Sequence, residues 1–107
     1  KDYAQAIDHY QKAAQLNPLS AEAPFNLGYI YATTGKYESA EEMLARAAAL
    51  KPVYLDKVLF NLAVVRQRIG KRQESLAALE AAVALRPENR KAQAYLNELK
   101  TDGREER

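Results

Sequence analysis

The chain has 107 residues, of which 48% are hydrophobic and 28% charged, so its length and composition predict one folded domain rather than a disordered segment. Its formal net charge of +2 is too small for the broad positive field that attracts nucleic acids, so no nucleic-acid partner is expected, and the absence of cysteine excludes disulfides and thiolate zinc sites. No apolar run approaches the roughly 18 residues of a membrane-spanning helix, so no membrane span is predicted, and composition leaves the cellular compartment undetermined.

The residue types favour helix along the whole chain, because Ala and Leu are abundant and there are only four Gly and four Pro. Apolar residues recur at intervals of three and four, as in Leu62, Val65 and Ile69. Gly35 and Gly70 permit the positive φ at which one helix ends and the next begins. Taken in chain order, helices are predicted at residues 2–16, 22–34, 37–50, 56–69, 72–85 and 89–100.

Two kinds of segment repeat along the chain. The segments AIDHYQKAAQLNP, AEEMLARAAALKP and SLAALEAAVALRP align, and their final prolines, Pro18, Pro52 and Pro87, are 34 and 35 residues apart. The preceding segments FNLGYIYATTGKYESA and FNLAVVRQRIGKRQES also align. Since each unit contains two predicted helices and a short turn, the repeat predicts a series of helical hairpins.

The repeat resembles the tetratricopeptide repeat (TPR) family. Its middle unit carries the family's pattern almost whole, as Leu27, Gly28, Tyr31, Ala40, Leu44, Ala47 and Pro52. The resemblance implies an all-α fold, a right-handed α-solenoid of about three TPR helix-turn-helix repeats with six helices and an inner groove. The chain departs from the pattern at Pro24 and Leu59, where the family usually has Trp, and at Arg66, where the middle unit has Tyr31.

The repeat divides the single domain, residues 1–107, into four parts. These are the second helix of a partial repeat at 1–20, repeats at 21–55 and 56–89, and a capping or partial-repeat helix with a charged tail at 90–107. In that tail, Gly103 to Glu106 resembles the turn at Gly70 to Glu74 and predicts the start of a further helix; a charged disordered end is the alternative. The small residues Gly28 and Ala63 predict close approach of paired helices.

No pattern of catalytic, cofactor-binding or metal-ligating residues is found, so enzyme activity is not expected. His9 is the only histidine and is interpreted as a surface residue, and the glycines form no phosphate-binding loop. The densest basic cluster consists of Arg66, Arg68, Lys71 and Arg72. It could bind phosphates, an acidic peptide or a membrane surface, but cations that complement a helix C-terminus are the favoured interpretation.

In TPR proteins the first helix of each hairpin lines the concave surface, and the resemblance implies the same here. An aromatic and amide-bearing groove suits a protein or peptide partner. Phe25 and Phe60 have an alternative role in packing against the adjacent second helix, and Asn26 and Asn61 one in bonding to the neighbouring hairpin. The predicted groove residues are Phe25, Asn26, Tyr29, Thr33, Lys57, Phe60, Asn61, Val64, Arg68, Lys91 and Tyr95, with Glu22 and Glu98 at the same face.

Some TPR co-chaperones hold the C-terminal carboxylate of heat-shock proteins with two Asn, two Lys and one Arg. Asn26, Asn61 and Lys91 match that set. Glu22 and Tyr95 replace its first Lys and its Arg, so we do not expect a chaperone-tail ligand. The sequence predicts a non-catalytic protein–protein interaction module that acts as scaffold or adaptor. The alternative is a structural spacer or self-association region of a larger enzyme or envelope complex.

Overall fold

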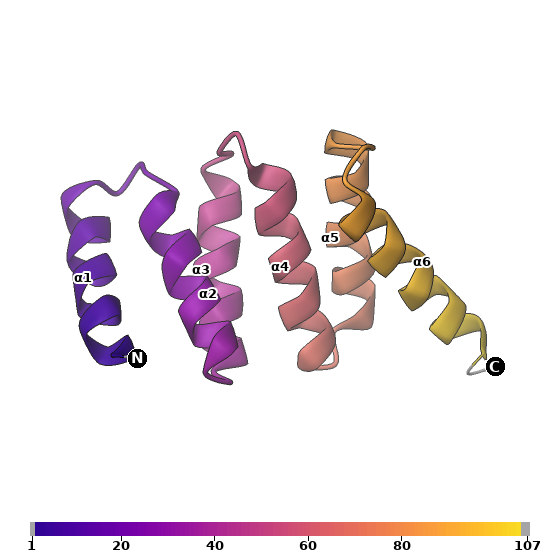
Figure 1. Ribbon diagram of the computed structural model, residues 1–107, viewed down its shortest axis with the longest axis horizontal. Helices are drawn as coiled ribbons and strands as arrows, with labels where there is room; N and C mark the ends of the chain where they lie inside the picture. Colours follow the sequence, from indigo (N-terminus) through magenta and orange to yellow (C-terminus); the bar gives the residue numbers. More distant parts are fainter. Residues whose placement is uncertain (1, 106–107) are drawn as a thin grey trace.

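The computed structural model describes residues 2–105, with the side chains of residues 2–101, and these residues form six helices and no strand. Each helix contacts the next one along the chain, which gives a row of antiparallel helices 46 Å long (Figure 1). The first five predicted helices are confirmed to within one residue at each end. The helices are α1 (Tyr3–Leu16), α2 (Glu22–Thr33), α3 (Tyr37–Ala49), α4 (Leu55–Arg68), α5 (Arg72–Leu85) and α6 (Arg90–Glu105).

The sixth helix continues beyond its predicted end, through Gly103 to Glu105. The predicted turn at Gly103 is therefore wrong, and Glu106 lies outside the described residues. At Gly35 and Gly70 a following helix docks on the core and stabilises the turn, whereas no such helix follows Gly103 among the described residues. Local preference then decides the conformation, and Arg and Glu favour helix.

The two hairpin turns have the backbone conformation that the glycines predict. Gly35 has a φ of 82° and Gly70 a φ of 79°, both in the left-handed region. In each turn the residue after the glycine closes the helix end: Lys36 N donates to Tyr31 O, and Lys71 N donates to Arg66 O, both at 2.8 Å. The chain therefore reverses within three residues in each turn, and the paired helices lie antiparallel.

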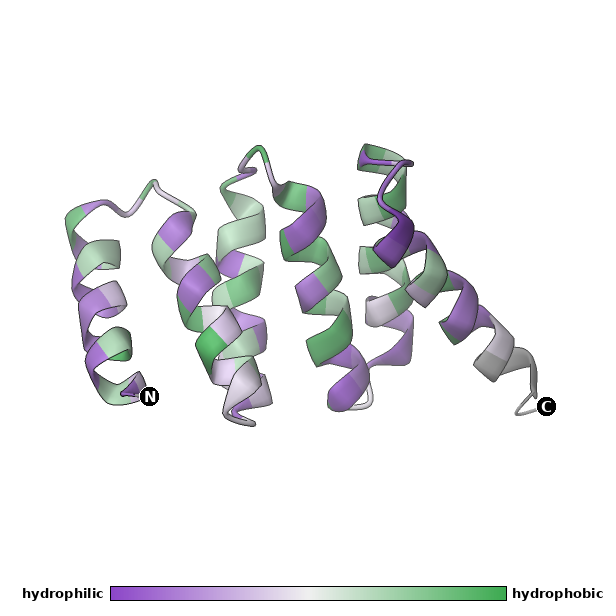
Figure 2. Cartoon of the chain, in the orientation of Figure 1, coloured by the Kyte–Doolittle hydropathy of each residue, from purple (hydrophilic) through white to green (hydrophobic). Residues whose placement is uncertain are grey.

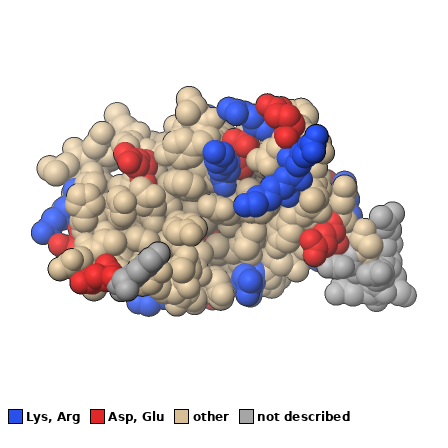
Figure 3. Space-filling view, in the orientation of Figure 1, with Lys and Arg blue, Asp and Glu red and all other residues tan. Residues whose placement is uncertain are grey.

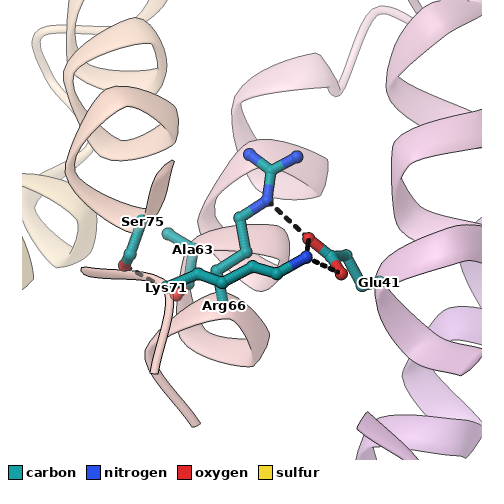
Figure 4. Close-up of polar contacts among 5 residues, drawn as sticks. All are labelled: Glu41, Ala63, Arg66, Lys71 and Ser75. Carbon is teal, nitrogen blue, oxygen red and sulfur yellow. Dashed lines mark hydrogen bonds and ion pairs between the residues drawn. The ribbon is translucent and has the colours of Figure 1, made fainter. Parts of the chain in front are cut away.

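Small residues bring the paired helices into close contact, as the repeat predicts. A Cβ placed on Gly28 would lie 2.6 Å from Leu44 Cγ, so only glycine fits there without displacement of Leu44. In the next hairpin, Ser75 Oγ donates a hydrogen bond of 2.7 Å to Ala63 O across the α4–α5 contact (Figure 4). The resulting core runs as two adjoining clusters along the row of helices.

Specific polar contacts fix the start of α6. Asn89 Oδ1 accepts a hydrogen bond from Ala92 N at 3.1 Å and so caps the helix, while Asn89 Nδ2 donates to buried Asp56 Oδ2 at 2.8 Å. The buried side of α6 carries Leu96 and Leu99, and the colours of Figure 2 show that most of its outer surface is polar. Within residues 2–105 no helix is long and apolar enough to cross a membrane.

Candidate functional site

The predicted groove residues lie on α2, α4 and α6, the first helices of the successive hairpins. In Figure 1, α2 lies in front of α3 and α6 in front of α5, so these first helices face the same side of the molecule. In Figure 3 the middle of that face carries few charged side chains. A partner on this side would meet a mainly uncharged surface between charged ends.

The central part of this face is a hollow of about 240 Å³ between α2 and α4. Buried Leu44 and Val65 lie beneath it, which places apolar core atoms at its floor. Because the hollow is shallow and mostly apolar, it suits side chains of a partner rather than a small polar metabolite. It brings together five of the predicted groove residues, namely Tyr29, Thr33, Phe60, Asn61 and Val64.

Asn26 and Asn61 occupy equivalent places on α2 and α4, and both are partly buried. Neither side-chain amide forms a hydrogen bond with another residue of the described chain. Asn61 lines the central hollow, and Asn26 lines hollows on either side of the start of α2. Each amide can therefore donate to and accept from a bound backbone without first breaking an internal bond.

The two phenylalanines contribute to both the core and the surface. The Phe25 ring lies 5.2 Å from that of Tyr54, and the Phe60 ring 5.7 Å from that of Tyr95. Both phenylalanines are half-buried against the core clusters. Both phenylalanines therefore pack against the core, and part of each side chain also lines a hollow on the first-helix face.

The α6 end of the face combines an aromatic pair with a cation. Lys91 Nζ lies 5.5 Å from the centre of the Phe60 ring, within the range of a cation–π interaction. Burial raises the pKa of the Tyr95 hydroxyl, and the nearby Glu98 carboxylate raises it further, although Arg68 opposes them. Tyr95 therefore stays protonated at neutral pH and can donate a hydrogen bond.

A larger hollow of about 650 Å³ lies where α2 and α4 begin. Its walls include Phe25, Tyr54 and one charge of each sign, Glu22 and Lys57. Burial, reinforced by the Glu22 carboxylate, raises the pKa of the Tyr54 hydroxyl. Tyr54 is not among the residues predicted from the sequence; its signal was an aromatic residue two positions before a predicted helix.

A third hollow, between α1 and α2, adds two further aromatics that the sequence analysis did not select. Tyr3 and Tyr10 of α1 line it together with Asn26, Tyr29 and Ile30. Their signal was a spacing of seven residues, which places both on one face of α1. The aromatic surface thus extends from α1 to α6 along the first-helix side.

Arg68 lies apart from the central hollow. Its guanidinium carbon is 6.0 Å from the centre of the Tyr37 ring, near the outer limit for a cation–π contact, and its side chain is exposed. Lys57 lines the larger hollow instead of the central one. The predicted residues therefore form an aromatic and amide centre with cations around its ends.

Three of the four cations in the basic cluster around Arg66 have partners within the chain. Arg66 Nε lies 3.1 Å from Glu41 Oε2, and Lys71 Nζ lies 2.9 Å from Glu41 Oε1 (Figure 4). Arg72 donates to the backbone oxygen of Leu99. Burial works to raise the pKa of the Glu41 carboxyl, but hydrogen bonds and charges from Lys71 and Arg66 outweigh it and hold that pKa below its ordinary value. These contacts make the cluster a link between hairpins.

Groups suited to chemical catalysis do not come together in the described part of the chain. His9 is exposed and packs edge-on against Tyr10 at 5.2 Å. Among residues 2–101, no three His, Asp or Glu side chains lie close enough together to hold a metal ion. The geometry of the first-helix side instead offers apolar area and hydrogen bonds, which are means of binding.

Two family models match the chain, each described as tetratricopeptide repeat, over residues 1–58 and 56–89. Among curated relatives, Superkiller protein 3 of Schizosaccharomyces pombe is 30% identical over 92% of this chain and 7% of its own length. Small glutamine-rich tetratricopeptide repeat-containing protein 2 of Mycosarcoma maydis is 30% identical over 83% of this chain and 25% of its own. The chain therefore spans a quarter or less of the length of these relatives.

Solved structures match the fold over nearly the whole chain. The first TPR of Spaghetti (RPAP3), bound to the HSP90 peptide SRMEEVD, has a TM-score of 0.85 and 27% identity over 94% of this chain and 79% of that one. The second TPR domain of human RPAP3, in complex with the HSP70 peptide SGPTIEEVD, has a TM-score of 0.83 and 28% identity over 92% and 81%. A Thermobaculum terrenum O-GlcNAc transferase is 27% identical with a TM-score of 0.80. That match includes 92% of this chain but only 19% of the transferase.

The match to an enzyme covers 19% of that enzyme, while the matches to the peptide-bound domains cover 79% and 81% of those chains. The fold and these neighbours together are those of a protein-interaction module rather than of a catalytic domain. The family models, the helical hairpins and the close approach of Gly28 to Leu44 all indicate the same repeat. The chain belongs to the tetratricopeptide repeat family.

Proposed function

We propose that this chain is a scaffold or adaptor module that binds an extended or helical segment of a partner protein across α2, α4 and α6. The observation that carries the proposal is the pair of equivalent asparagines, Asn26 and Asn61. Their amides lie beside an aromatic surface and form no side-chain hydrogen bond within residues 2–101. Aromatic residues supply buried contact area, and the amides supply hydrogen bonds to a peptide backbone.

The structural neighbours support a peptide as the type of partner, because two of them hold peptides that end in EEVD. The ends of the present face differ from a site built for a terminal carboxylate. Glu22 lies at the larger hollow, where it would repel a carboxylate, and Tyr95 is neutral at the α6 end. We therefore infer a ligand held by its backbone and apolar side chains rather than by a terminal carboxylate.

The test uses peptides selected from a random-sequence display library against the unmodified chain. In the double variant Asn26→Ala with Asn61→Ala, affinity for those peptides should fall by about 1–3 kcal/mol, because the backbone hydrogen bonds are lost. The melting temperature should change little. Asn97→Ala, at an exposed position on α6, is the matched control and should leave affinity unchanged.

Two outcomes would contradict this function. Full peptide affinity in the double variant would show that the amides do not face the ligand. If the double variant loses thermal stability sharply while its folded molecules keep full peptide affinity, the asparagines stabilise the fold and do not bind the ligand. Either result removes the first-helix face from the binding site.

One observation favours a second candidate, self-association or a spacer role. No residue of α1 is fully buried, although three of its residues align with completely buried residues of α3 and α5. An apolar helix face of this kind can pair with another helix. Sedimentation velocity over a hundredfold concentration range would detect such pairing as a rising sedimentation coefficient, and a constant value would exclude it. The aligned sets are Ala6, Tyr10 and Ala13; Ala40, Leu44 and Ala47; and Ser75, Leu79 and Ala82.

A further inference from the structure

Large exposed hydrophobic residues concentrate on one edge of the solenoid. This edge, here called the loop edge, comprises residues 16–22, 50–57 and 85–91 around the three connections that lie at the top of Figure 1. The tip of the connection between α3 and α4 is coloured as hydrophobic in Figure 2. Of five such residues in the described chain, Tyr29 lies on the groove face; the other four, Leu16, Leu19, Val53 and Leu85, are 87%, 82%, 87% and 52% exposed on the loop edge.

Two of these residues occupy equivalent places. Leu19 directly follows Pro18, and Val53 directly follows Pro52. The third unit has Glu88 at this place, so the repeat itself does not require an apolar residue there. Since both side chains are almost fully exposed, they contribute little to the core. A single exposed aliphatic needs no explanation, but two at equivalent loop positions on one edge form a pattern.

Exposed cations accompany the apolar tips. The loop edge has two exposed carboxylates, Glu22 and Glu88, while a third, Asp56, is buried and bonded to Asn89. Figure 3 shows Lys and Arg side chains gathered over the top of α4 and α6. Among the side chains of residues 2–101, no ion pair engages any of the five exposed cations of this edge, Lys51, Lys57, Arg86, Arg90 and Lys91.

The second and third connections are held together. Arg86 Nη2 donates to Val53 O at 3.1 Å, and Asn89 bonds to Asp56 at 2.8 Å. These contacts join the α5–α6 connection to the α3–α4 connection and to the start of α4. Val53 and the cations near it therefore form one fixed surface rather than independent loops.

The opposite edge lacks this combination. The turns at Gly35 and Gly70 also contain cations, but no large hydrophobic residue is among the exposed ones there. Lys71 is paired with Glu41, and Arg72 with a backbone oxygen. Exposed aliphatic tips beside unpaired cations are thus found on the loop edge only, within the part of the chain that the structure describes.

We propose that the loop edge is a docking site for membrane surfaces that contain anionic lipids. Leu19 and Val53 would enter the boundary between headgroups and acyl chains, and the cations would attract the headgroups. The tips stand on separate connections and the cations are spread along the edge, so a broad anionic surface can contact them together. The loop edge adjoins the predicted groove: Leu19 and Lys57 line the larger hollow, whereas Val53, Lys51 and Arg90 line none of the hollows described above.

The test measures co-sedimentation of the chain with phosphatidylcholine vesicles, with and without phosphatidylserine at a quarter of the lipid. The chain should bind the phosphatidylserine vesicles more tightly, and added salt should weaken this binding. Leu19→Asn combined with Val53→Asn should weaken vesicle binding by about tenfold or more. The reason is that the variant has no aliphatic side chain at either tip to transfer from water into the membrane. Lys51→Gln and Arg90→Gln should each weaken it by about fivefold.

The matched control is Lys36→Gln, an exposed cation on the opposite edge, which should bind the vesicles like the unmodified chain. All variants should keep their melting temperatures. Lys51→Gln and Arg90→Gln, at residues that line none of the described hollows, should also keep their affinity for groove-selected peptides, which separates this site from the proposed function. The proposal is overturned if phosphatidylserine vesicles are not bound, if the Leu19 and Val53 variant binds them equally well, or if Lys36→Gln weakens binding as much as Lys51→Gln. The proposal would also be overturned if the unmodified chain does not bind vesicles and the Leu19 and Val53 variant loses binding to a protein partner. That result would identify the loop edge as a protein interface.

Discussion

Replacement of Gly28 by alanine tests the close approach of α2 and α3. The new Cβ would lie 2.6 Å from Leu44 Cγ and 2.7 Å from Leu44 Cδ2, more than about 1 Å inside an ordinary carbon–carbon contact. Leu44 is completely buried, so it cannot move into solvent. Overpacking of this kind costs about 1–3 kcal/mol, whereas alanine gains about 1 kcal/mol of helix preference over glycine.

The two effects oppose each other, so the net expectation is a loss of about 1 kcal/mol, or about 4 °C in melting temperature for a chain of this size. A double-mutant cycle separates them. In a Leu44→Ala background the obstacle is gone, and Gly28→Ala should then stabilise the chain by about 1 kcal/mol. Ala77→Gly, at an exposed site within α5, measures the helix-preference effect alone and should cost a similar amount.

The assay is urea unfolding followed by circular dichroism at the helix band, with midpoints compared at a constant slope because repeat proteins can depart from two-state behaviour. The coupling between Gly28 and Leu44 should be about 1–3 kcal/mol. If Gly28→Ala changes stability equally in both backgrounds, the steric explanation is refuted. Stabilisation in the unmodified chain would show that the helices do not approach as closely as the structure has them.

Three further predictions concern stability. Ala40→Leu or Ala82→Leu, at completely buried positions, should each cost about 1–3 kcal/mol by overpacking, and neutral behaviour would contradict the helix contacts. Glu41→Gln should cost about 1 kcal/mol at pH 7. Because the folded pKa of Glu41 lies below the ordinary 4.5, this difference in thermal stability should persist above pH 4.5 and disappear as the pH falls through that lowered pKa; a constant difference would refute the ionic contribution. Removal of residues 88–107 should lower the melting temperature, since it uncovers Leu79 and leaves Asp56 without its partner, and unchanged melting would exclude a capping role for α6.

The predicted groove residues illustrate how far a repeat pattern can locate a surface. The equivalence of Asn26 and Asn61 in two aligned units selected them from the sequence, and the tertiary structure brings Asn61 to the central hollow. Tyr54 and Tyr10 line neighbouring hollows but belong to a connection and to a second helix. A rule that first helices line the groove therefore could not select them.

The local sequence determined the helices, their turns and their pairing. The spacing of apolar residues, the small residues such as Gly28 and the positive φ of Gly35 and Gly70 depend on interactions within about one hairpin, and this information is present in each unit. At Gly103 the repeat pattern predicted a turn, and this prediction is wrong because α6 continues through that residue.

Contacts between hairpins were decided by the tertiary structure alone. Glu41 precedes Arg66 by 25 residues and Lys71 by 30, and their residue types gave no sign that one carboxylate would pair with two members of a basic cluster. The exposure of Leu19 and Val53, and the position of the unpaired cations beside them, likewise depend on how successive hairpins stack. Which charges are neutralised and which apolar residues stay in water follow from distances between units, and these arise only when the whole core is assembled.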